Sequence, residues 1–125
     1  MSPELFEKWV PAFVSTILSE TPVYALFLRD RLGLGAALAV GVALQCITHP
    51  LFWLAWDAEA DFFYRHYGDS VVAFELVIFL AEAGIVWALL RPRKPWERLP
   101  NIALALIASA GANALSLGLG MLSER

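Results

Sequence analysis

Long apolar segments separated by short charged stretches dominate the pattern of hydrophobic and polar positions along this chain. Four of them have the roughly 20 residues that a helix needs to cross a bilayer at about 1.5 Å per residue. They are residues 10–28, 33–56, 71–90 and 101–122. The pattern therefore predicts an all-α integral membrane protein, with residues 1–125 forming a single transmembrane domain, a four-transmembrane-helix bundle.

The composition agrees with this pattern and shows where the charges lie. Of the 125 residues, 59% are hydrophobic, more than the roughly one half that is usual for a soluble domain. None of the nine Lys and Arg residues falls inside a predicted span, whereas three of the twelve acidic residues do: Glu20, Glu75 and Glu82. The remaining nine acids equal the nine bases in number, so the formal net charge of −3 belongs to the spans.

These three intramembrane glutamates are the strongest indication of function in the sequence. Glu75 and Glu82 lie seven residues apart, about two helical turns, and therefore share one face of the third predicted span. A carboxylate in lipid is unfavourable, so such residues normally face the bundle interior, where they are protonated, share a proton, pair with a histidine or hold a cation. We therefore expect a polar site inside this bundle.

Polar residues of the first span fit the same interior site. Thr16 and Glu20 lie four residues apart on one face. Pro22 removes a helical hydrogen bond near Glu20, which predicts a kink there. Because free backbone groups are tolerated in a membrane only against protein or water, residues 19–22 are expected to face inward.

The second span combines small residues with polar ones. Gln45 and His49 continue a ridge that repeats every four positions at Gly33, Ala37 and Gly41. Such a ridge of small residues lets helices approach closely. Pro50 predicts a second interruption of helical hydrogen bonding beside these polar side chains.

The fourth span has two distinct faces. Ser109, Asn113 and Ser116 share one face at helical spacing. Asn101 is expected to cap the start of this helix, because asparagine is favoured at that position. A second ridge of small residues is formed by Ala110, Ala114 and Gly118.

The charged connections predict the orientation of the bundle. Residues 29–31 are expected to form a tight charged turn, and residues 91–98 form a basic loop that we expect to bind anionic lipid headgroups. These connections hold six of the nine bases, so the positive-inside rule places both termini, and the acidic, aromatic connection 57–70, on the non-cytoplasmic side. A bacterial inner membrane is the expected location. The first ten residues lack the basic region of a signal peptide, so they are expected to remain in the mature chain.

The two halves of the chain echo each other. Glu20 is followed nine residues later by Arg29, and Glu82 is followed nine residues later by Arg91. The segments between each glutamate and its arginine are both apolar and both contain an aromatic residue. This match has an offset of 62 residues.

The following spans extend the match with an offset of 68 residues, which a longer loop explains. Gln45-x-x-Thr48 in the second span corresponds to Asn113-x-x-Ser116 in the fourth. We interpret the two halves as duplicated helix hairpins, parallel repeats related by an axis along the membrane normal. Such an axis would bring the first and third glutamates together near mid-depth, with the two amides beside them.

Two residues depart from this symmetry. Phe13 stands at the position equivalent to Glu75, and Leu117 at the position equivalent to His49. Glu75 and His49 both lie about 8–9 Å inside the outer ends of their spans. Their equal depth predicts a Glu75–His49 pair.

The residues favour a proton- or cation-coupled transporter or channel. Two carboxylates that lie close together in a low dielectric cannot both ionise, so they would store a proton, and a neighbouring histidine–glutamate pair would relay it. The candidate site residues are Glu20, Gln45, His49, Glu75, Glu82 and Asn113, supported by Thr16, Thr21, Pro22, Thr48, Pro50, Ser109 and Ser116.

Two alternatives remain open. One is a structural or accessory subunit, in a homo-oligomer or a larger membrane complex, whose polar faces hold helices together through hydrogen bonds worth about 1 kcal/mol each. The other is a membrane-embedded metal-binding protein or metalloenzyme, with Glu20, His49, Glu75 and Glu82 as ligands for Zn²⁺, Mn²⁺ or iron. No cofactor is required, a divalent metal is compatible, and an enzyme is the less favoured class. Nucleic-acid binding is disfavoured because the chain is acidic, with a pI near 5.3.

Overall fold

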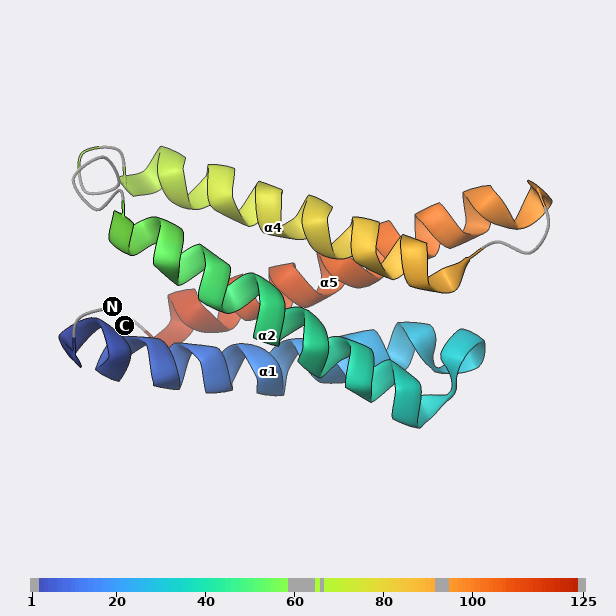
Figure 1. The fold of residues 1–125 in the computed structure, drawn as a ribbon, viewed down its shortest axis with the longest axis horizontal. Helices are drawn as coiled ribbons and strands as arrows, with labels where there is room; N and C mark the ends of the chain where they lie inside the picture. Colours follow the sequence, from blue (N-terminus) through green and yellow to red (C-terminus); the bar gives the residue numbers. More distant parts are fainter. Residues whose placement is uncertain (1–2, 59–64, 66, 92–94, 124–125) are drawn as a thin grey trace.

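The computed structural model describes residues 3–58, 65, 67–91 and 95–123. Its long helices are α1 (Pro3–Leu32), α2 (Leu34–Ala58), α4 (Tyr67–Leu90) and α5 (Arg98–Ser123), and a short 3₁₀ helix, η1 (Pro95–Glu97), precedes α5 (Figure 1). All four long helices contain a segment long and apolar enough to cross a membrane. The predicted all-α fold, with four helices long and apolar enough to cross a membrane, is confirmed, and their insertion into a membrane stays a prediction.

The four helices pack as an antiparallel bundle. α1 packs along α2, α4 packs along α5, and α1 also packs on α5, whereas the contact between α2 and α4 is slight. Figure 1 shows the α1–α2 turn, the end of α4 and η1 at one end of the bundle. The beginning of α1 and the end of α5 lie at the other end.

A single glycine makes the turn between α1 and α2. The φ angle of Gly33 is 83°, a left-handed conformation that glycine adopts without a steric penalty. Its N–H donates to the carbonyl of Arg29 at 2.8 Å, and the N–H of Ala37 donates to the carbonyl of Gly33 at 2.9 Å. Residues 29–31 are still helical, so the prediction of a turn there is wrong. The glycine ends the helix, and the charged residues form its last turn.

Proline does not end the helices of this bundle. Pro22 and Pro50 lie within the continuous helices α1 and α2. Residues 19–21 are buried as expected, but Pro22 is exposed, so that part of the inward prediction is wrong. Each residue rotates the side chain by about 100° around the helix, and the fourth residue of this group therefore reaches the outer face.

The start of α5 also differs from the expectation. The helix begins at Arg98, so Asn101 lies inside its first turn and does not cap it. Asn101 is buried, and its Oδ1 atom has no hydrogen-bond partner among the described residues. The preceding turn of η1 continues directly into α5, which leaves no capping role for this side chain.

Small residues determine how closely the helices approach. Gly41 of α2 lies against Thr21 of α1 so tightly that a Cβ atom there would come within 3.0 Å of the Thr21 Cα. On α5 the buried small residues are Ala105, Ala108 and Ala112. The predicted second ridge of small residues, at positions 110, 114 and 118, is exposed. The rotation of α5 that turns Ser109 inward also buries its neighbour Ala108, and the ridge lies on the outer surface.

The outer surface of the bundle is apolar. Large hydrophobic side chains are exposed on all four long helices, for example Leu18 (70%), Leu51 (61%), Val77 (63%) and Ile107 (54%). A surface of this kind is unfavourable in water and matches the hydrocarbon of a bilayer. The polar residues of the spans instead gather in the interior, where they form the site described next.

Candidate functional site

Glu82 of α4 is the centre of a polar cluster inside the bundle, and its exposed fraction is 0%. Its Oε2 atom accepts hydrogen bonds from Tyr24 Oη at 2.7 Å and Asn113 Nδ2 at 2.9 Å. Its Oε1 atom accepts from Thr48 Oγ1 at 2.9 Å and Gln45 Nε2 at 3.2 Å. These donors come from α1, α2 and α5, so each of the other three long helices contributes.

Glu20 of α1 joins this cluster through one amide group. Gln45 Nε2 donates to Glu20 Oε2 at 2.6 Å and also to Glu82 Oε1 at 3.2 Å, so it bridges the two carboxyl groups. Glu20 is only 3% exposed. Ser116 of α5 lies near the Glu20 carboxyl group. Four of the six predicted site residues are therefore brought together.

Thr48 has a choice of hydrogen-bond partners. Its Oγ1 atom carries a single proton and lies 2.9 Å from two acceptors, the carbonyl oxygen of Leu44 on its own helix and Oε1 of Glu82. When Thr48 donates to Leu44, its oxygen is free to accept a hydrogen bond from a protonated Glu82. When it donates to Glu82, it stabilises the ionised carboxylate. The same geometry is compatible with both charge states of Glu82.

A second layer of hydrogen bonds orients the amide of Asn113. The Nδ2 atom that donates to Glu82 also donates to the carbonyl of Ser109 at 2.9 Å. Ser109 in turn donates its hydroxyl to the carbonyl of Phe79 on α4 at 3.0 Å. The nitrogen of Asn113 is thereby directed at the carboxyl group, and α5 is tied to α4 on both sides of the cluster.

His49 lies away from Glu75, with which it was expected to pair. Its ring lies among three aromatic rings, with centroid distances of 6.4 Å to Trp9, 5.3 Å to Phe13 and 6.3 Å to Trp53. Its Nδ1 atom has no hydrogen-bond partner within the described part of the chain. The predicted pair is absent because α2 packs mainly against α1 and only slightly against α4.

The remaining predicted residues lie around the cluster. Glu75 is half-buried two turns before Glu82 on α4. Thr16 donates to the carbonyl of Ala12 in its own helix at 2.9 Å. Thr21 packs against α2, and its Oγ1 atom has no partner among the described residues. The two prolines of the prediction contribute no side-chain hydrogen bond, since proline has none to offer.

The sequence reasoning missed Tyr24. This residue is fully buried, and its phenol donates the shortest hydrogen bond to Glu82. A signal was present, because Tyr24 is the only one of the three tyrosines that lies inside a predicted span. Tyrosine in membrane proteins usually lies at the interface, so one at mid-span indicates a buried partner for its hydroxyl.

The predicted metal ligands do not form a common ligand set. Glu20 and Glu82 meet at Gln45, whereas His49 lies in the aromatic group and Glu75 lies two turns away along α4. Within the residues that the structure describes, no group of three or more His, Cys, Asp or Glu side chains is placed to hold a metal ion. Whether any of these four residues binds a metal ion stays a prediction.

Comparison of the chain with protein-family models, with curated proteins and with solved structures finds no match.

Proposed function

We propose that this protein is a small proton- or cation-coupled transporter or channel, with Glu82 and Glu20 as its proton-binding centre. One observation carries the proposal. Glu82 is fully buried among neutral donors and shares the Gln45 amide with a second buried carboxyl group. An intramembrane carboxyl group in such a position is typical of a proton or ion pathway.

The surroundings of the two carboxyl groups favour proton storage. No Lys or Arg occurs within residues 10–28, 33–56, 71–90 and 101–122, so no basic side chain lies at that depth to balance the charge. Two neighbouring carboxylates in a low dielectric cannot both ionise without a cation. The pair therefore shares one proton or binds a cation in its place, and exchange between these two states is the basis of coupled transport.

The hydrogen-bond pattern links protonation to helix packing. A carboxylate accepts four hydrogen bonds, but a protonated carboxyl group must donate one, so Tyr24 or Thr48 has to reorient when Glu82 gains a proton. Because the donors lie on three other helices, each change of charge alters contacts that hold the bundle together. This is the kind of local event that biases a conformational equilibrium.

The duplicated-hairpin hypothesis belongs to the same proposal. Gln45 donates to Glu20 as Asn113 donates to Glu82. Thr48 donates to Glu82, and its counterpart Ser116 lies near Glu20. Both kinds of contact are exchanged by one approximate twofold relation between the α1–α2 and α4–α5 hairpins, as parallel repeats around a central site require.

The orientation of the bundle follows the bases. By the positive-inside rule, the end that carries the α1–α2 turn and the α4–η1 connection faces the cytoplasm, and both termini face the opposite side. A bacterial inner membrane remains the proposed location.

Proton flux in proteoliposomes tests the proposed function. A pH gradient is imposed across vesicles that contain the purified chain, and internal pH is followed with a trapped fluorescent indicator. Glu82→Gln keeps the size of the side chain but removes its titration, and we expect flux to fall at least about tenfold. Glu7→Gln, the same chemical change at an exposed position of α1, is the control and should leave flux unchanged. Equal flux in the wild type and in Glu82→Gln contradicts the proposal.

A structural or accessory subunit is the second candidate, and a specific observation favours it. The bonds to Glu82 connect α4 with α1, α2 and α5, which also serves to hold a bundle together. Under this alternative, Glu82→Gln lowers the stability of the bundle and has no effect on proton flux. Copurification of a fixed membrane partner at constant stoichiometry would support it further.

A further inference from the structure

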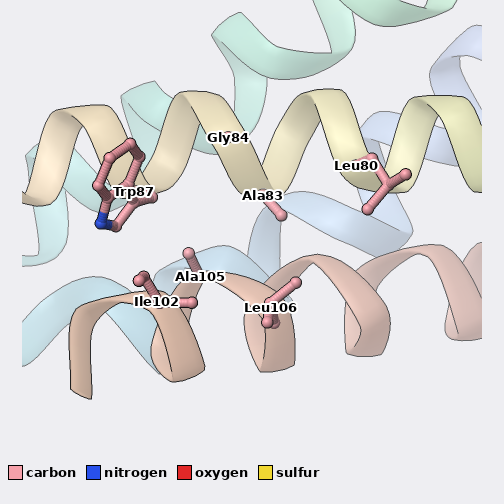
Figure 2. Close-up of a pocket in the computed structure, with 7 residues that line it drawn as sticks. All are labelled: Leu80, Ala83, Gly84, Trp87, Ile102, Ala105 and Leu106. Carbon is pink, nitrogen blue, oxygen red and sulfur yellow. The ribbon is translucent and has the colours of Figure 1, made fainter. Parts of the chain in front are cut away.

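The outer surface between α4 and α5 carries an apolar groove that the proton-binding centre does not use. Its volume is about 220 Å³, and its walls include Leu80, Gly84 and Trp87 of α4 with Ile102 and Leu106 of α5. Figure 2 shows Trp87 and Ile102 toward one end of the groove and Leu80 at the other. The groove lies within the apolar segments that cross the membrane, so its natural occupant is a hydrocarbon chain.

A second cavity continues this groove at the end of the helices. It has a volume of about 430 Å³ and is lined by Trp87, Ala88, Arg91 and Arg98. Trp87 belongs to both cavities and connects them. Arg91 directly follows the last residue of α4, and Arg98 is the first residue of α5, so two arginines line one space at the end of these helices.

We propose that this composite groove binds one anionic phospholipid. Its phosphate lies between Arg91 and Arg98, because guanidinium groups match phosphate oxygens in charge and geometry. The ring of Trp87 lies at headgroup depth, where amphipathic aromatic side chains are favoured. One acyl chain runs along the apolar groove past Gly84. This assignment is independent of any role of Glu82 in transport.

The charges favour a lipid over other occupants. None of the described residues that line the second cavity is acidic, so the two arginines present an unbalanced positive surface. A second copy of this chain would place its own two arginines against them, and like charges would repel. Free phosphate would satisfy the arginines but would leave the apolar groove unfilled.

Native mass spectrometry of the purified full-length chain in detergent tests this proposal. Micelles are doped with phosphatidylglycerol or with phosphatidylcholine, and the lipid retained per chain is counted. We expect the wild type to retain phosphatidylglycerol preferentially. The double variant Arg91→Gln/Arg98→Gln should weaken this preference about 25-fold, since each guanidinium group that hydrogen-bonds the phosphate contributes about a fivefold effect.

Arg29→Gln/Arg31→Gln is the matched control, because it removes the same charge from the same end of the bundle. It should leave the preference for phosphatidylglycerol within about twofold of the wild type. Equal losses in the two double variants would mean that the attraction is diffuse, and they would overturn the proposal.

The apolar part of the site has its own test. A Cβ atom at Gly84 meets nothing within 4 Å, so Gly84→Leu fills the groove without disturbing the packing of the helices. We expect it to weaken phosphatidylglycerol retention at least about fivefold, because each displaced methylene weakens binding about fourfold. Gly118→Leu, at another open glycine, is the control. Circular dichroism verifies that both variants are folded, and equal retention in the two would place the acyl chain outside the groove and refute the proposal.

Discussion

The two helices of the α1–α2 hairpin pack closely at a level where the α4–α5 hairpin has an apolar groove on its outer surface. Gly41 brings α2 so close to α1 that a Cβ atom would lie 3.0 Å from the backbone of Thr21. At the corresponding level of the second hairpin, Gly84 faces open space and lines an apolar groove. Two hairpins with related polar residues therefore use their small residues differently. One glycine permits helix packing, and the other leaves room on the lipid-facing surface.

The polar side chains of the two hairpins are also unequal. Tyr24 lies four residues after Glu20, but the residue four positions after Glu82 is Val86. The phenol of Tyr24 crosses to Glu82, which therefore receives a donor that has no counterpart at Glu20. Glu82 therefore receives more hydrogen bonds than Glu20, and the two carboxyl groups have unequal surroundings.

The largest predicted effect comes from removing the carboxyl group of Glu82, the one that receives more hydrogen bonds. We expect Glu82→Leu to lower the free energy of unfolding by about 3 kcal/mol, because it removes four hydrogen bonds and leaves the Tyr24 hydroxyl buried without an acceptor. Glu20→Leu should lower it by about 1 kcal/mol, since Gln45 keeps its bond to Glu82. The measurement is reversible unfolding in mixed micelles of increasing sodium dodecyl sulfate content, followed by circular dichroism.

Glu7→Leu controls for the loss of an acidic side chain as such. Glu7 is exposed near the start of α1, and its replacement should change the free energy of unfolding by less than about 0.5 kcal/mol. If Glu20→Leu and Glu82→Leu destabilise the bundle equally, the two carboxyl groups contribute equally to stability, and the proposed difference between them is incorrect.

The sequence predicted the helices and much of the cluster, for a physical reason. Uninterrupted apolar segments of about 20 residues have few alternatives to spanning helices, and carboxyl groups within them must turn inward. The match between the two halves then placed Gln45 and Asn113 beside Glu20 and Glu82, where the structure has them. Whether these residues bind protons stays a prediction.

The sequence could not predict which helices touch. The depth of a residue along a helix follows from counting, but the neighbour it faces depends on how the bundle packs. Glu75 and His49 have similar depths, yet His49 meets the aromatic rings of α1 because α2 packs on that helix. The sequence also predicted a turn at residues 29–31, whereas α1 continues through them. Charged residues are compatible with a last helical turn, and the left-handed conformation of Gly33 ends the helix.

The second prediction compares the packing around Gly41 with the packing around Gly84 by adding one methyl group at each position. Gly41→Ala should lower the free energy of unfolding by about 1–2 kcal/mol, because the added Cβ meets the backbone of Thr21 and pushes α1 and α2 apart. Gly84→Ala should raise it by up to about 1 kcal/mol, since alanine favours the helix and nothing lies within 4 Å. The same unfolding titration measures both, and effects of the same sign would show that the two sites are packed alike.

The smallest predicted effect concerns the two chain reversals at the same end of the bundle. Gly33 turns the chain with a φ of 83°, whereas the residue after α4 is Arg91, with a φ of 29°. Gly33→Ala should lower the free energy of unfolding by about 1 kcal/mol, because a side chain in the left-handed region is penalised. Its interhelical contacts are not affected, since a Cβ atom there meets nothing within 4 Å.

Arg91→Gly is the reciprocal change, and it separates the backbone of this position from its side chain. In detergent without anionic lipid, it should raise the free energy of unfolding by less than about 1 kcal/mol, since glycine adopts a positive φ without strain. With phosphatidylglycerol present, the gain should disappear, because the variant has lost one of the two guanidinium groups that face the cavity beside Trp87. An equal increase in the free energy of unfolding with and without this lipid would mean that Arg91 acts only through its backbone conformation in the turn. The second hairpin would then differ from the first only in how its helices pack.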